Sequence, residues 1–179
     1  MLKLTIAAPE YWDEQKQEFV YGKETILQLE HSLVSLSKWE SKWKKPFLGC
    51  DLTFEETIDY IRCMTLTQNV NPEIYQKLTS KNIREVRRYI SEPMTATKPR
   101  KDESSKRVKE PITAEILYSD MINLGIPFEC QKWHLSRLIT LIRVCDIRSR
   151  PPKKLKPGER QKQYAAINAA RRKQWNTKG

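Results

Sequence analysis

Apolar and polar residues alternate only near the start of the chain. Leu2, Leu4 and Ile6 occupy every second position, a pattern typical of a β-strand with one buried face. Two more short apolar runs, 18–21 and 26–30, follow a polar stretch. These runs predict two or three short strands at the N-terminus.

After residue 30 the apolar positions recur every three to four residues, as they do in amphipathic helices. The first such stripe contains Leu33, Leu36, Trp39 and Trp43, and it ends before Pro46. Two tryptophans at this spacing are more typical of core anchors than of a ligand platform. We therefore predict a helix over 33–43 with both tryptophans on one face.

Capping signals locate the helices that come next. Thr53 and Glu56 have the spacing of a capping box, and Asn71 followed by proline predicts the start of a short helix. Thr79 or Ser80 is the predicted cap of a third helix. The apolar stripes expected on the first and third of these helices are Phe54, Ile58, Ile61 and Thr65, and Ile83, Val86 and Ile90.

The second half of the chain begins with a segment that has little to bury. Residues 94–111 are rich in charge, proline and serine, which predicts a flexible linker. Beyond it, Thr113 and Gly125 bracket a predicted helix, and 131–145 is the most apolar helical segment. A last helix is expected from Glu159 to Trp175, with a thin apolar stripe.

These patterns predict a mainly α fold. We expect a helical bundle-like body, a small N-terminal β element of two or three short strands, and a basic C-terminal helix. The predicted divisions are an N-terminal β/helical region (1–93), a flexible linker (94–111), a central helical hairpin (112–150) and a basic, partly disordered C-terminal segment (151–179).

Charge separates the two halves of this 179-residue chain. Residues 1–97 contain 13 basic and 14 acidic side chains, whereas residues 98–179 contain 20 basic and 8 acidic ones, and the whole chain has a net charge of +11. Such a basic half indicates either a solvated end or a surface for a polyanion or acidic partner. The N-terminus lacks the features of a signal peptide, and no apolar run is long enough to cross a bilayer, so we expect a soluble intracellular protein with no membrane contact.

Residue types that support catalysis are sparse. His31 and His134 are the only histidines and neither lies in a nucleophile motif, and with five glycines the chain has no glycine-rich phosphate loop. The four cysteines are dispersed, which favours reduced thiols, and the pair Cys130 and His134 falls short of a metal site. We predict a non-enzymatic protein without a cofactor or metal.

The second half resembles a known protein family. A helix ending in Leu124-Gly125-Ile126 precedes a Trp133-containing segment, Trp133-His134-Leu135-Ser136-Arg137-Leu138-Ile139, and then Ile147-Arg148 and a charged C-terminal helix. This order resembles the tail assembly chaperones of long-tailed, non-contractile bacteriophages over roughly residues 110–173. The run 29–43 is also similar to phage proteins encoded near tail genes.

The resemblance implies a helical protein that binds the tape measure protein, keeps it soluble and helps the major tail tube protein polymerise around it. It implies a location in the host cytoplasm and absence from the mature virion, and it leaves self-association open. Such a chaperone needs exposed apolar surface with a charged rim. The residues predicted to bind partners are Trp39, Trp43, Trp133, Tyr164, Ile167, Arg171, Arg172, Lys173 and Trp175.

An alternative remains open, namely a small basic helical phage protein that binds nucleic acid. The positive second half supports it, and Tyr164 and Trp175 offer rings for base stacking beside Arg and Lys. No helix-turn-helix with a recognisable recognition helix is evident from the sequence. Salt dependence distinguishes the two hypotheses, because phosphate binding weakens steeply with salt and apolar binding does not.

Overall fold

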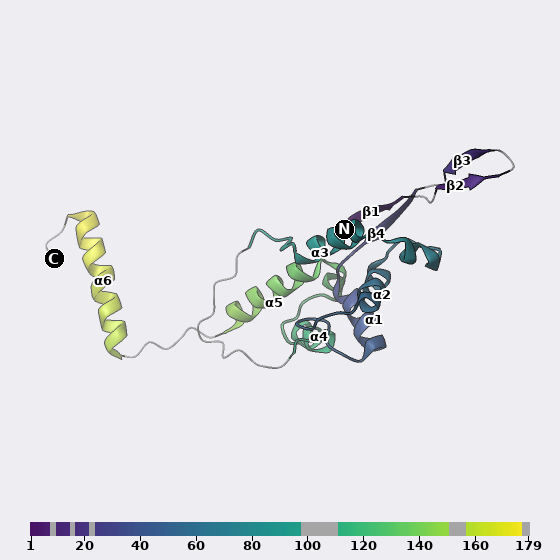
Figure 1. The fold of residues 1–179 in the computed structure, drawn as a ribbon. Helices are drawn as coiled ribbons and strands as arrows, with labels where there is room; N and C mark the ends of the chain where they lie inside the picture. The colour runs from purple at the N-terminus through teal and green to yellow at the C-terminus, as the bar shows by residue number, and fades with distance from the viewer. Residues whose placement is uncertain (8–9, 15–16, 22–23, 98–110, 151–156, 177–179) are drawn as a thin grey trace. The chain divides into compact units, whose positions relative to one another are not determined.

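The fold is mainly α, with a small antiparallel β element at the N-terminus, as the sequence predicts (Figure 1). The computed structural model describes residues 1–7, 10–14, 17–21, 24–97, 111–150 and 157–176. The chain divides into two compact units, Met1–Ile147 and Arg148–Gly179. The predicted region 1–93 and residues 112–147 of the predicted hairpin lie in the first unit, and residues 148–150 lie in the second.

Parts of two predicted segments cannot be compared with the structure. Residues 98–110 of the predicted flexible linker lie outside the described residues. Residues 151–156 and 177–179 of the predicted partly disordered C-terminal segment do so as well.

The β element consists of two antiparallel ladders. Strand β1 (Leu2–Ile6) pairs with β4 (Thr25–Leu29), and β2 (Glu10–Asp13) pairs with β3 (Glu18–Tyr21). Leu2 lies opposite Leu29 and Glu10 lies opposite Tyr21. The pairing of β2 with β3 therefore continues the register in which β1 pairs with β4. The hydrophobic pattern does not reveal β2, because acidic residues flank its two aromatic positions.

The ladder of β1 and β4 supplies one wall of the hydrophobic core. Leu4, Ile6, Leu27 and Leu29 are buried on one face, while Ile26 on the other face is exposed. This alternation is what a strand pair with a single covered face requires. The remaining core residues come from the helices that follow.

Helices α1 (Leu33–Trp43) and α2 (Phe54–Met64) pack against each other, and α1 also contacts two elements of the second half. Ser32 caps α1, and the predicted capping box of Thr53 and Glu56 begins α2. Lys44 ends α1 in the left-handed conformation, at a φ of 55°. The helix with the tryptophan pair is therefore the structural centre of the larger unit.

A short 3₁₀ helix, η1 (Pro72–Lys77), and helix α3 (Ser80–Ser91) follow, capped by Asn71 and Thr79 as the sequence predicts. Helix α3 packs on β1. The side-chain amide of Asn82 donates a hydrogen bond to the Thr5 carbonyl oxygen, 3.3 Å away, and so ties the two elements together.

The second half contributes α4 (Ala114–Asn123), the 3₁₀ helix η2 (Phe128–Lys132) and α5 (Leu135–Ser149). Gly125 adopts the predicted left-handed conformation, with a φ of +63°. The predicted helix over 131–145 in fact begins at Leu135. His134 forms a β-bridge with Ser32 and the Leu135 N–H donates to the His31 carbonyl oxygen. The predicted first turn is therefore divided between the end of η2 and an extended junction at Trp133 and His134.

The smaller unit contains helix α6 (Pro157–Trp175), which begins two residues before the predicted start and ends at the predicted residue. Its described side chains are all exposed. That exposure agrees with the thin apolar stripe in its sequence.

Candidate functional site

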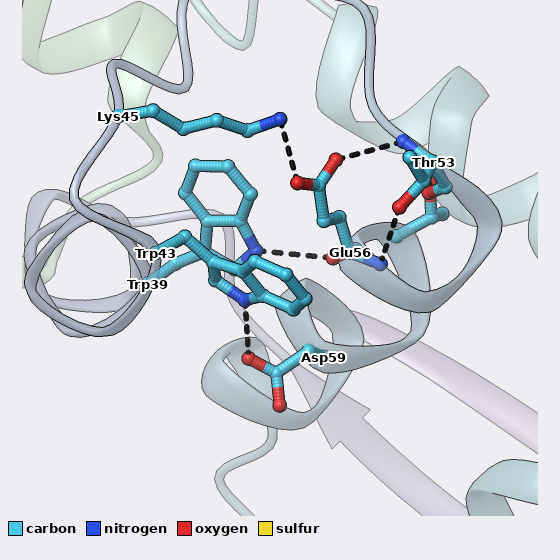
Figure 2. A network of polar contacts seen from close by, with 7 residues as sticks. Trp39, Trp43, Lys45, Thr53, Glu56 and Asp59 are labelled. Atoms are coloured by element: carbon cyan, nitrogen blue, oxygen red, sulfur yellow. Dashed lines mark hydrogen bonds and ion pairs between the residues drawn. The ribbon is translucent and has the colours of Figure 1, made fainter.

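The two tryptophan rings of α1 stack on each other, with Trp39 in the core and Trp43 nearer the surface (Figure 2). The ring centroids of Trp39 and Trp43 are 6.1 Å apart at an angle of 26°. Trp39 is 0% exposed, and its indole N–H donates to the Glu56 carbonyl oxygen at 3.0 Å. Its complete burial removes Trp39 from the predicted partner-binding residues, because no part of its surface is free to touch another molecule.

Trp43 is the half-buried ring of the pair, and its indole N–H is hydrogen-bonded to a carboxylate. Its indole N–H donates to Asp59 Oδ2 at 2.9 Å, and Lys42 pairs with Asp59 Oδ1 at 2.5 Å. Burial alone would raise the pKa of Asp59, but the hydrogen bonds from Lys42 and Trp43 keep it below the ordinary value. A charged Asp59 therefore fixes the orientation of the half-buried Trp43 ring.

A second carboxylate connects the loop after α1 to the start of α2. Glu56 accepts a hydrogen bond from the Thr53 N–H at 2.8 Å and pairs with Lys45 at 2.6 Å. These contacts lower the pKa of Glu56 below its ordinary value, and the contact with Lys45 contributes the most. Figure 2 shows both carboxylates beside the two indole rings. The network holds α1 and α2 in a defined geometry.

A groove of about 610 Å³ opens beside Trp43, between α1, α2 and η1. Its lining combines apolar and charged side chains, among them Lys42, Trp43, Phe54, Ile58, Arg62 and Tyr75. Phe54, in the first turn of α2, is 67% exposed. The Arg62 guanidinium lies 5.2 Å from the centre of the Tyr75 ring, so a cation covers an aromatic face within the groove.

Sequence reasoning placed Phe54 on the buried stripe of α2 and did not identify the groove. The buried residues of α2 include Thr57, Tyr60, Ile61 and Met64, a stripe rotated away from Phe54. The sequence contained this signal, because positions 57, 60, 61 and 64 also share one helix face. Arg62 and Tyr75 come from separate elements, and no local pattern relates them.

Trp133 is the third predicted partner-binding tryptophan, and it lies elsewhere. It follows η2 and is half-buried, with the Arg137 guanidinium 4.0 Å from its ring centre. It is not among the residues that line the groove beside Trp43. The predicted tryptophans therefore do not form a single surface.

Helix α6 carries the remaining predicted residues in a unit of its own. Tyr164, Ile167 and Trp175 are exposed and lie on one helix face with Arg171, since they are spaced by three, four and four residues. Arg172 and Lys173 are also exposed. The helix thus has a narrow apolar stripe interrupted by one cation and flanked by others.

Among the described residues, no three His, Cys, Asp or Glu side chains gather as metal ligands. The four cysteines are free, and burial raises the pKa of the Cys63 thiol. Within residues 1–97, 111–150 and 157–176, apart from the three short gaps near the N-terminus, no helix is long and apolar enough to span a membrane.

Comparison with protein-family models, curated proteins and solved structures finds no match to this chain.

Proposed function

We propose that this protein is a non-enzymatic tail assembly chaperone of a long-tailed, non-contractile phage, and that it binds the tape measure protein. Two independent lines support the proposal. One is the resemblance of residues 110–173 to that family. The other is the groove beside Trp43, which offers apolar surface with a charged rim.

The observation that carries the proposal is the position of Phe54. A large aromatic side chain with 67% of its surface exposed, at a groove that also contains Trp43 and Ile58, is suited to an apolar partner. Long helical clients present apolar residues at every third or fourth position, and such helices bind by inserting them into grooves of this kind. Lys42 and Arg62 then contact the polar flanks of the client helix.

Helix α6 is the second contact region in this proposal. Tyr164, Ile167 and Trp175 supply apolar contacts to the tape measure protein or to the major tail tube protein, and Arg171, Arg172 and Lys173 contact their acidic rims. The chaperone acts in the host cytoplasm while the tube polymerises, and it is absent from the mature virion.

The groove is tested by Phe54→Asp, with Ile122→Asp as the matched control. Ile122 is 64% exposed and lies on α4, away from the groove lining, so both changes place a carboxylate on an exposed apolar site of the same unit. We expect Phe54→Asp to reduce co-purification of the tape measure protein by tenfold or more, because a charge at the groove must be desolvated on binding. The control should bind like the wild type. Equal binding by both variants would exclude the groove as the client site.

Deletion of residues 158–179 tests the role of α6. Because every described side chain of α6 is exposed, we expect the thermal stability of the larger unit to remain nearly unchanged. Co-purification with the tape measure protein should be lost. If the truncated chain instead keeps its client soluble but loses binding to DNA, the nucleic-acid-binding alternative is the better account of α6.

A further inference from the structure

Helix α3 is held firmly by one face. Asn82, Val86 and Tyr89 are buried, and the amide of Asn82 donates to the Thr5 carbonyl oxygen at 3.3 Å. The Tyr89 hydroxyl donates to Glu30 Oε1 at 2.7 Å. These contacts to β1 and the end of β4 fix which side of α3 faces solvent.

The outward side of α3 is basic over its full length. Lys81, Arg84, Arg87 and Arg88 are all exposed, and the one acidic residue of the helix, Glu85, is half-buried. Within the part of the chain that the structure describes, none of the four cations forms an ion pair; Met1 with Glu30, Lys42 with Asp59 and Lys45 with Glu56 are ion pairs elsewhere in the larger unit. We call the four cations the α3 basic face.

The α3 basic face has opposing effects on its own helix: Arg88, in the last turn, is favoured by the helix dipole, whereas other cations of the face are not. Lys81 lies in the first turn, where the helix dipole disfavours a cation, and this turn contains no acidic residue. Arg84 and Arg88 are four residues apart, a spacing at which like charges repel by a few tenths of a kcal/mol. Glu85 lies four residues after Lys81 and three before Arg88, and it lines the same hollow as these two cations and Arg84. The face therefore has one acidic residue against four cations, and a bound anion can neutralise the excess.

The composition of this face distinguishes between classes of anionic partner. Ser80 and Ser91 are exposed beside the four cations, and the apolar residues of α3 are buried or half-buried, with Ile90 in a hollow beside Arg87. Most protein interfaces are centred on large buried anchors, whereas contacts to a phosphate backbone come mainly from Arg, Lys and hydroxyl side chains, which is the composition of this face. We infer that the α3 basic face binds the phosphate backbone of nucleic acid without sequence preference, as an activity separate from client binding at the groove.

Replacement of all four cations by glutamine in the full chain tests this inference. Binding to a 20-base-pair DNA duplex is measured by fluorescence anisotropy at several salt concentrations. Each lost phosphate contact reduces the slope of log affinity against log salt by about 0.9, so the slope should become shallower by about 3 to 4. Affinity near about 0.1 M salt should fall more than tenfold. The changes are Lys81→Gln, Arg84→Gln, Arg87→Gln and Arg88→Gln.

A matched control separates this face from the net charge of the protein. Four exposed cations on β1, α1, η2 and α5 are replaced instead, with the same loss of charge; they are Lys3→Gln, Lys38→Gln, Lys132→Gln and Arg143→Gln. We expect this control to keep most of the affinity and the salt slope. An equal loss in both variants, or binding of poly-glutamate with none of DNA, would overturn the inference.

Thermal unfolding provides the second readout. Repulsion among the four cations is opposed by the favourable interactions of Lys81 and Arg88 with Glu85 and of Arg88 with the helix dipole, so the replacement should leave the melting temperature nearly unchanged. A clear decrease, together with unaltered DNA binding, would show that the cations serve the fold and not a ligand.

Discussion

Replacing Glu40 by alanine is expected to lower the free energy of unfolding by about 2–6 kcal/mol. Glu40 is buried on α1, and its carboxylate accepts hydrogen bonds from the Phe47 N–H at 2.8 Å and the Ala114 N–H at 2.7 Å. Each buried N–H left without a partner costs about 1–3 kcal/mol. Since small domains are stable by only about 5–15 kcal/mol, urea unfolding should show a large shift of the midpoint.

Glu40 contributes this much to stability because its carboxylate takes the place of the side-chain cap that α4 lacks. Thr113, the N-cap residue of α4, makes no side-chain capping hydrogen bond, and Ala114 is the first residue of the helix. The carboxylate on α1 thus takes the position of the cap and of the favourable negative charge at a helix N-terminus. Glu115→Ala is the matched control, because Glu115 is an exposed acid in the same turn, and its loss should cost less than about 1 kcal/mol. Similar costs for both variants would contradict the assignment.

Mild acid is expected to destabilise the larger unit through a buried histidine pair. The rings of His31 and His134 are 5.1 Å apart at the junction of β4, α1 and α5, and both are buried. Burial, with a smaller contribution from His134, lowers the pKa of His31 to about 3. Burial also lowers the pKa of His134, although its hydrogen bond to the Tyr89 carbonyl oxygen opposes this shift.

The sign of this pH dependence follows from which state, folded or unfolded, binds the proton more readily. Below the ordinary pKa of about 6.5 the unfolded chain takes up a proton that folded His31 does not accept until about pH 3. The stability is therefore complete above pH 6.5 and decreases as the pH falls, by about 1.4 kcal/mol for one pH unit. Glu30, Glu92 and the terminal amino group also act on His134, with the carboxylates opposing the amino group.

Urea unfolding at pH 7 and pH 5.5 measures this effect above the range in which most carboxylates titrate. We expect a loss of roughly 1.4 kcal/mol from His31, and His134 adds to it in the same direction. His31→Gln can keep a polar contact to the Tyr60 hydroxyl, which lies 2.5 Å from His31 Nδ1, but it does not titrate. The difference between the two pH values should therefore become smaller in this variant. An unchanged difference would exclude His31 as its source.

Local signals predicted the helices well because local contacts decide them. The capping box of Thr53 and Glu56, the caps Asn71 and Thr79, and the left-handed Gly125 all appear where the sequence placed them. Each involves groups within a few residues of one another, so spacing and residue type are sufficient. The mainly α fold class follows from these elements.

Contacts between distant segments account for what the sequence did not reveal. Helix α5 begins late because Leu135 is bound to His31, about a hundred positions away in the chain. The periodicity of α1 places both tryptophans on one face, but only packing against α2 buries Trp39 and leaves Trp43 at the groove. The groove itself combines α1, α2 and η1, whose association no local pattern encodes.

The amount of soluble tape measure protein during co-expression tests the proposed chaperone function most directly. The measurement compares the wild-type chain, the Phe54→Asp variant and an empty vector. Each is co-expressed, at an equal level, with the tape measure protein that the proposed function assigns as the client. We predict a several-fold larger soluble fraction with the wild type, and a fraction close to the empty-vector value with Phe54→Asp. The same soluble fraction in all three samples would contradict the proposal that this protein keeps the tape measure protein soluble.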